Sequence, residues 1–503
     1  MLTAILIGAL IAVSWADETY DDPNTLPNRQ TMVHLFEWKW NDIAKECEDF
    51  LQHYGYGAVQ ISPPMEHLWI VKNNGVPWWV RYQPVSYKLQ SRSGSRSEFI
   101  SMVERCNKVG VRIIVDGVFN HMVGVGQKKG AYNVKSSGDS DFDGTDGVEN
   151  FPGVGYTKDH FDDWRCHGDI NRGDYQGSAE RVRNCRLTGL LDLNQGHEFV
   201  RKKVIAYMNE LIDIGVAGFR LDASKHMWPA DLKAIVDGVK NVRSDIFGAN
   251  KRPFIVHEVI DRGGEAVKCN EYIDIGRYTD FNYGSTVAKA AWKQIDFSDM
   301  RYFGKGYGYG NLDSHDVLAF IDNHDNQRDS SPYVPTYKSG DQYAMSVGFM
   351  LAWNYGYPRV MSSYYFSYSD QSPPAGSNYA TTSPVINQQY KTCEESSGWV
   401  CEHRWYAIRG MARFRQEVTG TGVDNEKYEQ HRLAFGRGGK GYFALNNGYG
   451  VWSFTASTGM PAGTYCDVWT GEKKNNACTG VTVTVQSNGK LSQHKRQNKM
   501  SVK

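Results

Sequence analysis

Three apolar segments of this sequence lead into acidic residues, namely Asp222, Glu258 and Asp325. Cleavage of an acetal requires an acid that protonates the leaving oxygen and a carboxylate that stabilises or traps the oxocarbenium ion, and a retaining enzyme holds the two about 5 Å apart. We therefore interpret Asp222 as a nucleophile, Glu258 as a general acid/base and Asp325 as a carboxylate that orients the sugar ring. The alternative is that each acid only caps the following helix; this suits any single acid better than all three together.

The elements that would position these acids are short apolar runs that alternate with amphipathic helical stretches. This alternation predicts parallel strands joined by crossover helices, and eight such units predict a closed (β/α)8 TIM barrel with its active site at the C-terminal strand ends. The predicted strands are Thr31–Trp38, Gly57–Ser62, Val111–Phe119, Gly215–Asp222, Phe254–Glu258, Tyr278–Tyr283, Val317–Asn323 and Arg359–Ser363. The clearest predicted helices are Asp42–His53, Ser97–Val109, His197–Ile214 and Pro229–Phe247.

Two stretches do not fit the barrel pattern. Residues 121–190 are rich in Gly, Asp, Ser and Asn and are too long for a single loop, so they predict a small domain inserted after strand three. This insertion divides the barrel into residues 17–120 and 191–419. Residues 420–487 predict a C-terminal antiparallel β-sandwich, and residues 488–503 are interpreted as a polar, basic, frayed tail.

The first 16 residues form an apolar run that ends in small residues, which is typical of a cleavable secretory signal. The run is shorter than the ~20 residues that cross a bilayer, and no later segment of the sequence is long and apolar enough. A formal net charge of +0 offers no field that would attract nucleic acid or an anionic membrane. We expect a secreted protein with a neutral substrate and with no nucleic-acid or membrane partner.

Nine cysteines in a secreted chain predict disulfides and one remaining thiol. Proximity in the sequence suggests the pairs Cys166–Cys185, Cys393–Cys401 and Cys466–Cys478. Cys47 and Cys106 lie on the two predicted helices that flank the second strand and are a further candidate pair, so Cys269 is left over. The sequence has no pair of CxxC motifs, so we do not expect a structural zinc site.

Several segments give the sequence a specific resemblance. Val115–His121, Gly218–His226, His257–Asp261 and Phe320–Arg328 resemble, in order, spacing and strand context, the four signature regions of the alpha-amylase family. The segments Trp78–Pro84, Cys185–Leu193 and Arg359–Tyr364 are similar to the animal, chloride-dependent members in particular. The resemblance extends from about Gln30 to Thr484. It implies a secreted enzyme that hydrolyses internal α-1,4 links of starch, glycogen and malto-oligosaccharides with retention of configuration.

The resemblance implies a structural calcium ion that joins the inserted domain to the barrel. The matching ligands are the side chains of Asn120 and Asp192 and the backbone carbonyls of Arg183 and His226. All four groups offer oxygen, which is what a hard cation requires. Without the other three, Asn120 would be interpreted as a hydrogen-bonding turn residue.

The resemblance also implies a chloride site, formed by Arg220, Asn323 and Arg359. Arg220 alone could instead pair with Asp222, keep it ionised and lower its pKa. A nearby anion would favour the protonated form of Glu258, which is the form a general acid needs near neutral pH. We expect activity to rise with chloride, and we expect an Arg359→Gln variant to lose most of that response.

Substrate contacts follow from the same resemblance. Trp78, Trp79 and Tyr82 offer faces on which glucose rings can stack, although a Trp-Trp pair is more often part of a core. The predicted hydrogen-bonding residues are Gln83, His121, Lys225, His226 and His324. Asp116 is expected to position Arg220 and not to take part in the chemistry.

The sequence departs from vertebrate family members at two places. Asp329–Pro335 stands where those members have a glycine-rich mobile loop, so gating of the cleft by that loop is in doubt. Val123 and the segment Ser91–Ser97 lack the cysteines that vertebrate members pair there. We expect a monomer, because no heptad pattern is present, and no N-glycosylation, because no Asn-x-Ser/Thr sequon is present.

Two other functions stay open at this point. One is an α-glucosidase or transglycosylase, because loops choose the acceptor on a shared scaffold. The other is an inactive carbohydrate-binding homologue. The animal-type segments argue against the first, and the presence of all three carboxylates argues against the second.

Overall fold

The computed structural model describes residues 20–304, 311–329, 331–495 and 499–502. The predicted secretory signal, residues 1–16, lies outside these ranges, as does Ser330. Within the described ranges, no helix has both the length and the apolar composition needed to cross a membrane.

A closed barrel of parallel strands forms the centre of the molecule, with its strands in the order β1, β14, β13, β12, β11, β10, β4 and β2. The bounds are β1 Met32–Leu35, β2 Ala58–Ile61, β4 Arg112–Gly117, β10 Gly218–Leu221, β11 Phe254–His257, β12 Arg277–Asp280, β13 Val317–Phe320 and β14 Tyr357–Ser362. Buried residues from the N-terminal parts of these strands, such as Met32, Ile114 and Phe254, pack together and fill the barrel. The predicted TIM barrel is confirmed.

The sixth predicted strand, Tyr278–Tyr283, is too long. Strand β12 ends at Asp280, whose side chain accepts hydrogen bonds from the backbone N–H groups of Asn282 and Tyr283. This N-cap begins helix α8, Phe281–Ala291, so the last residues of the predicted strand belong to a helix.

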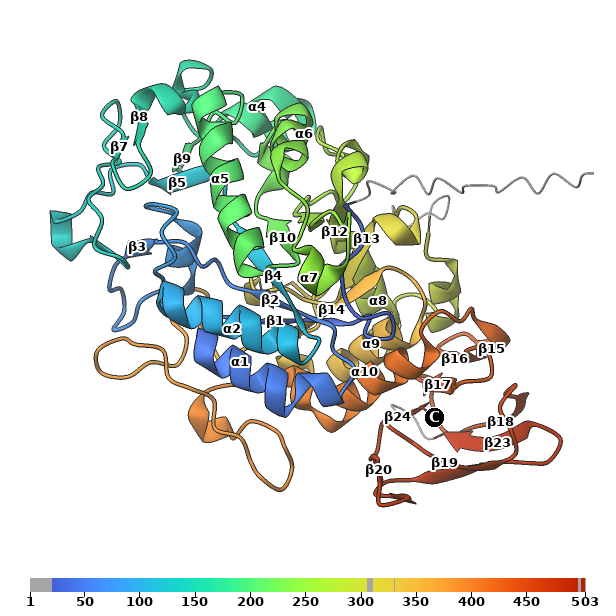
Figure 1. Ribbon diagram of the computed structural model, residues 1–503. Helices are drawn as coiled ribbons and strands as arrows, with labels where there is room; N and C mark the ends of the chain where they lie inside the picture. The colour runs from blue at the N-terminus through green and yellow to red at the C-terminus, as the bar shows by residue number, and fades with distance from the viewer. Residues whose placement is uncertain (1–19, 305–310, 330, 496–498, 503) are drawn as a thin grey trace, which may run out of the picture.

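Helices cover the outside of the barrel (Figure 1). They are α1 Trp40–Asp49, α2 Arg96–Lys108, α5 Glu198–Ile214, α6 Pro229–Gly238, α9 Asp341–Ala352 and α10 Tyr406–Val418, together with α8. The prediction of one helix over Pro229–Phe247 is wrong, because Val239 is extended and the chain becomes helical again only in α7, Ser244–Phe247. Gly238 and the β-branched Val239 both have poor helix propensity, which favours an end at this point.

The inserted domain leaves the barrel and returns to it through one short ribbon. Strand β5, His121–Gly124, pairs antiparallel with β9, Leu190–Asp192. The domain also contacts the loop after β2, where β3, Leu68–Trp69, pairs with β6, Lys135–Ser136. Its other elements include β7 Asn150–Phe151, β8 Tyr156–Thr157, α3 Asp174–Gly177 and α4 Ala179–Asn184.

The C-terminal domain is all-β and lies beside α8, α9 and α10 (Figure 1). A four-stranded antiparallel sheet contains β15 Asp424–Glu429, β16 Arg432–Gly436, β17 Tyr442–Asn446 and β24 Lys499–Val502. Two-stranded ribbons pair β18 Trp452–Ser457 with β23 Lys490–Lys495, β19 Gly463–Cys466 with β22 Thr482–Val485, and β20 Lys473–Lys474 with β21 Ala477–Cys478. Tyr442, Trp452 and Leu491 pack in a core between them, as the predicted sandwich requires.

The prediction of a frayed tail at residues 488–503 is wrong for the part that the structure describes. Strand β23 pairs with β18 from Lys490 to Lys495, and β24 pairs with β17. An antiparallel strand can bury one face only, so polar and basic side chains can alternate with a buried Leu491. The prediction missed these strands because the segment is polar and basic in composition.

All the predicted disulfides are confirmed. They join Cys47 to Cys106, Cys166 to Cys185, Cys393 to Cys401 and Cys466 to Cys478. The first one ties α1 to α2 on the outside of the barrel, and the second lies within the inserted domain. Cys269 is the free cysteine, and it is buried.

Candidate active site

The C-terminal ends of the barrel strands β10, β11 and β13 bring the three predicted catalytic acids to one cleft of about 430 Å³. Asp222 and Glu258 directly follow Leu221 of β10 and His257 of β11, which are paired, so the two acids leave the barrel side by side. Asp325 follows β13 at the start of a short 3-10 turn and lines the same cleft.

Arg220 is the electrostatic centre of this site. It lies on β10 and is 2% exposed. Its Nη1 atom is 2.6 Å from both Asp116 Oδ1 and Asp222 Oδ1, and its Nη2 atom is 2.6 Å from Glu258 Oε1. Because Asp116 comes from β4, one guanidinium joins three neighbouring strands, and Asp116 contacts Arg220 as expected.

Asp116, Asp222 and Glu258 share the Arg220 guanidinium. Burial raises the pKa of Asp222 well above its ordinary value; Arg220 lowers it, while Glu258 and Asp116 raise it further. The Arg220 guanidinium therefore opposes the effect of burial on the pKa of Asp222. Burial in the cleft and then the charge of Glu258 raise the pKa of Asp325 to about 6.

The backbone after Asp222 adopts a strained conformation that serves the site. Ala223 has a φ of 50°, in the left-handed region that non-glycine residues rarely adopt. Its backbone N–H donates to Glu258 Oε2 at 2.9 Å. Since Arg220 contacts the other oxygen, both oxygens of Glu258 are held in place.

Aromatic residues form one wall of the cleft. The Tyr82 hydroxyl donates to Asp116 Oδ2 at 2.9 Å, and its ring stacks on His324 with centroids 4.9 Å apart. Trp78 Nε1 donates to the Ser369 carbonyl at 2.9 Å. The predicted substrate residues that line the cleft are Trp78, Trp79, Tyr82, His121, Lys225, His226 and His324.

Gln83 is the predicted substrate residue that does not line this cleft. Its Oε1 atom accepts a hydrogen bond from the backbone N–H of Gly124 at 2.9 Å. The contact ties the loop after β2 to the inserted domain, so the structure gives Gln83 a bridging position.

The cleft also contains residues that the sequence did not indicate, among them Tyr175, Ile260 and Glu265. The ammonium group of Lys225 pairs with Glu265, donates to the Ile260 carbonyl at 2.8 Å and lies 4.9 Å from the centre of the Tyr175 ring. Burial lowers the pKa of Lys225 to about 8. Ile260 and Glu265 follow Glu258 in one loop, which is a usable signal, whereas Tyr175 reaches the cleft only through the fold of the inserted domain.

Two of the predicted calcium ligands, Asn120 and Asp192, lie close together where the inserted domain joins the barrel, because the Leu193 N–H donates to the Asn120 carbonyl and His121 pairs with Asp192. Asn120 and Asp192 are buried, and the Oδ1 atom of Asn120 and both carboxylate oxygens of Asp192 have no hydrogen-bond partner. The His226 ring contacts the Val182 carbonyl at 2.9 Å, which brings His226 against the residue before Arg183. Buried oxygens without a partner favour a cation, and an all-oxygen set fits calcium.

The three predicted chloride ligands lie close to the catalytic acids. The Nε atom of Arg220 is buried and has no hydrogen-bond partner. Arg359 donates from Nη1 to Gln60 Oε1 at 2.7 Å, and burial and then the charge of Arg220 lower the pKa of Arg359 to about 10. Asn323 Oδ1 accepts from the backbone N–H of Asp325 at 3.0 Å, which orients its amide. The free buried Nε–H donor of Arg220 and the repulsion between the Arg220 and Arg359 guanidinium groups fit an anion.

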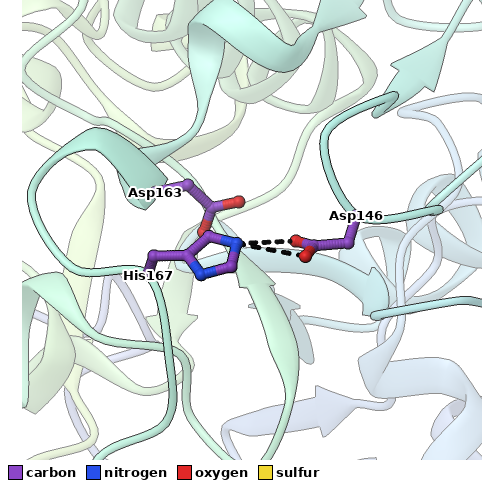
Figure 2. Close-up of side chains that lie close together, drawn as sticks. All are labelled: Asp146, Asp163 and His167. Carbon is purple, nitrogen blue, oxygen red and sulfur yellow. Dashed lines mark hydrogen bonds and ion pairs between the residues drawn. The ribbon is translucent and has the colours of Figure 1, made fainter.

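A second group of potential metal ligands lies on the inserted domain, where Asp146, Asp163 and His167 approach one another (Figure 2). His167 Nε2 is 3.1 Å from each carboxylate oxygen of Asp146. Arg186 Nη2 lies 2.6 Å from Asp146 Oδ1 and also contacts Asp163. Because a guanidinium already supplies positive charge and Asp146 is exposed, this cluster has no need of a metal ion.

Comparison with known proteins identifies the family to which a site of this geometry belongs. Residues 49–351 match the family described as Alpha amylase, catalytic domain, and residues 423–502 match Alpha amylase, C-terminal all-beta domain. The pancreatic alpha-amylase of Rattus norvegicus is 46% identical over 500 residues, which cover 97% of this chain and 95% of that protein. An alpha-amylase of Tenebrio molitor is 47% identical over 471 residues, with 93% and 95% covered.

Solved structures agree with the sequence comparisons. Wild-type alpha-amylase I from Eisenia fetida is similar with a TM-score of 0.86 at 38% identity, and the match covers 95% of this chain and 97% of that one. A point variant of that amylase, solved in complex with maltohexaose, matches equally well. A gamma-CGTase from Alkalophilic bacillus clarkii, with a TM-score of 0.61 and 18% identity, is similar in fold alone.

Proposed function

This chain belongs to the alpha-amylase family and is a glycosidase that cleaves α-1,4 links within starch, and we propose that it does so by a retaining double displacement. In this proposal Asp222 is the nucleophile, Glu258 the general acid/base and Asp325 the carboxylate that orients the ring. The observation that carries it is the contact of one guanidinium with both Asp222 and Glu258 at the ends of adjacent strands. A retaining pair must be close, about 5 Å apart, and the shared contact with one guanidinium supports such a separation.

The reaction has two steps with balanced proton transfers. A carboxylate oxygen of Asp222 attacks the anomeric carbon while protonated Glu258 gives its proton to the glycosidic oxygen, so the bond to the leaving chain breaks. Glu258 then takes a proton from water, and the water oxygen attacks the same carbon and releases Asp222 as a carboxylate. Asp325 binds hydroxyl groups of the reacting ring, with hydrogen bonds that strengthen as the ring distorts.

Arg220 serves both stages of this reaction. Before attack, the negative charge of the pair is on Asp222, and in the covalent intermediate it is on Glu258. Since the guanidinium contacts both groups at 2.6 Å, it stabilises either charge without moving. Such a preorganised cation needs no rearrangement at the moment of reaction.

The substrates we assign are starch, glycogen and malto-oligosaccharides. The maltohexaose bound to a variant of the Eisenia fetida amylase supports this class of substrate. The wall formed by Trp78, Trp79 and Tyr82 offers stacking faces, and Lys225, His121 and His324 offer polar groups along the same cleft.

Asn120 and Asp192, with the carbonyls of Arg183 and His226, would hold a calcium ion. When bound, the ion supplies positive charge to the buried oxygens at the junction of the two domains. Arg183 supports the same junction through its own side chain, because its Nη2 atom is 2.8 Å from Glu271 Oε2. We assign calcium a structural role, since Asp192 does not line the catalytic cleft.

Arg220, Asn323 and Arg359 would hold a chloride ion as an activator. When bound, chloride supplies negative charge that favours the protonated form of Glu258 and balances the second guanidinium. An Arg359→Gln variant should lose most of the chloride response of kcat and should bind chloride more weakly in a titration followed by intrinsic fluorescence.

We further propose that the protein is secreted and monomeric. The four disulfides fit an oxidising, extracellular environment, where digestion of polysaccharide takes place outside the cell.

The decisive experiment measures release of reducing ends from soluble starch by the purified mature chain. We expect cleavage that rises with chloride, needs calcium for stability and is lost in Glu258→Gln. The matched control is Glu210→Gln, whose carboxylate lies in an exposed ion pair with Arg96 and should keep full activity.

The products separate this proposal from its alternatives. An endo-acting enzyme shortens the starch chains steeply before small sugars accumulate. Glucose as the first product would indicate an α-glucosidase, and longer chains made from malto-oligosaccharides would indicate a transglycosylase. A folded wild-type chain that cleaves nothing would be an inactive carbohydrate-binding homologue.

A further inference from the structure

The turn at residues 160–165 of the inserted domain carries two adjacent aspartates with different surroundings. Asp163 pairs with Arg186 near the surface. Asp162 is 2% exposed, and its Oδ1 atom is buried without a hydrogen-bond partner. Burying an ionised oxygen without a donor or a cation is costly, so this atom requires an explanation.

Backbone pairing places Asp162 against Asp192. Phe161 and Leu193 form an antiparallel bridge, with Asp162 after the first and Asp192 before the second. The bridge is isolated and Asp162 begins a 3-10 turn, so the bridge brings the two acidic residues near each other without extending into a ladder. Both acidic side chains are buried beside this bridge.

The other side of Asp192 is occupied by the segment that carries Asn120. The Leu193 N–H donates to the Asn120 carbonyl at 2.8 Å, and His121 pairs with Asp192. Asp192 thus lies between the end of β4 and the turn that holds Asp162. Oxygen atoms from all three segments are buried and unpartnered at this junction, namely Asn120 Oδ1, Asp162 Oδ1 and both carboxylate oxygens of Asp192.

The chain supplies little positive charge here. Arg165 lies 3.3 Å from Asp162, but through the other oxygen, Oδ2, and its own side chain is 28% exposed. Across the described ranges, no lysine or arginine forms an ion pair with Asp192. Two buried carboxylates therefore have one partly exposed protein cation beside them, which contacts only Asp162, whereas in the exposed cluster of Figure 2 the Arg186 guanidinium contacts both carboxylates.

We propose that Asp162 is a further ligand group of the calcium pocket, so that the carboxylates of Asp162 and Asp192 face one cation. The proposal rests on the calcium site assigned above and deepens it. A second carboxylate makes the pocket more selective for a divalent cation, because calcium affinity follows the charge of the ligand set. It also connects the ion to the turn that leads into the Cys166–Cys185 disulfide, so calcium would order this part of the inserted domain too.

The test is calorimetric titration of calcium into the full mature chain after removal of metal with EDTA. Asp162→Asn keeps the size of the side chain and removes its charge, and we expect it to raise the calcium dissociation constant about 10- to 100-fold. Asp163→Asn removes the same charge one residue away. It should change the constant less than about fivefold, because its carboxylate is partly exposed and already paired with Arg186.

Thermal unfolding is a second measurement, and its dependence on calcium would not be expected if Asp162 had a purely structural role. With excess calcium, Asp162→Asn should unfold at a lower temperature than the wild type. With EDTA, the order should reverse or the two should coincide, because the variant no longer buries an uncompensated carboxylate.

The outcomes distinguish this proposal from the calcium site on which it rests. Wild-type protein that binds calcium while Asp162→Asn binds it equally well would overturn the role of Asp162 alone. Wild-type protein that binds no calcium would overturn the site and this proposal together. If Asp162→Asn does not fold, Arg165→Gln replaces it, since removing the competing cation should tighten calcium binding; unchanged or weaker binding would count against the proposal.

Discussion

The floor of the catalytic cleft is the cluster of Arg220 with Asp116, Asp222 and Glu258. This floor and the junction with the inserted domain both bury acidic side chains, but the negative charges are compensated differently. At the floor, Asp116, Asp222 and Glu258 surround a guanidinium that is part of the chain. At the junction, Asp162 and Asp192 keep buried oxygens without any hydrogen-bond partner. One site contains its counter-charge, and under the calcium proposal the other takes its counter-charge from solution.

This difference separates the residues that act on catalysis from those that act on the stability of the folded state. A cation that belongs to the chain is always present, so it can stabilise negative charge on Asp222 and on Glu258 in turn. A cation taken from solution stabilises the folded state by an amount that depends on its concentration. Changes at the floor should therefore act on activity at any calcium level, whereas changes at the junction should act on stability in a calcium-dependent way.

The largest expected effect comes from Asp222→Asn, which removes the nucleophile. We expect kcat on soluble starch to fall at least about 10⁴-fold, because an amide oxygen cannot form the covalent intermediate. Calcium affinity should stay as in the wild type. The matched control is Asp213→Asn, whose carboxylate is 65% exposed and should be silent in both assays. Loss of calcium binding in Asp222→Asn would show that the two sites are not independent.

Arg220→Gln should have the next largest effect, on the free energy of unfolding. Removing one partner from a buried ion network leaves uncompensated charges and costs about 3–5 kcal/mol. Urea unfolding in saturating calcium measures this loss. Arg201→Gln, which breaks a partly exposed pair with Asp231, should cost less than about 1 kcal/mol. Equal losses in the two variants would mean that Arg220 does not neutralise the floor.

The barrel fold and the catalytic acids could be predicted from the sequence, because both depend on patterns within short segments of the chain. The acids Asp222 and Glu258 directly follow short apolar strands, and position along the strand is enough to bring them together. Asp162 gave no such signal: it is one of several acids in a polar loop, and its burial depends on the bridge between Phe161 and Leu193. Tyr175 reaches the cleft for the same kind of reason, through tertiary structure of the inserted domain.

A smaller effect on activity is expected from a change of pH, through Asp325 in the catalytic cleft. The pKa of Asp325 is raised to about 6, so this carboxyl is protonated at a higher pH than an ordinary aspartate. We expect kcat/KM on a soluble malto-oligosaccharide to decrease as pH falls below about 6, approaching tenfold per pH unit. Stability should change in the opposite sense, because the folded state binds this proton more tightly than the unfolded chain between about pH 4 and 6.

Asp329→Asn tests the origin of that pKa. The charge of Asp329 is one of the causes that raise the pKa of Asp325, so its removal should move the acid limb of the profile to lower pH. Asp313→Asn, a change of the same kind outside the cleft, should leave the limb in place. An acid limb that does not move in either variant would assign it to another group.

The smallest effect on stability is expected at the exposed cluster of Asp146, Asp163 and His167. This cluster tests the comparison at a third group of acidic residues. Asp146 and His167 are exposed, and Arg186 already contacts both Asp146 and Asp163. Asp146→Asn should therefore change the free energy of unfolding by less than about 1 kcal/mol. Calorimetry should give one calcium ion per chain in both the wild type and this variant. A second ion that disappears in Asp146→Asn would mean that nearness of acidic groups, and not the lack of a protein cation, decides where this chain binds metal.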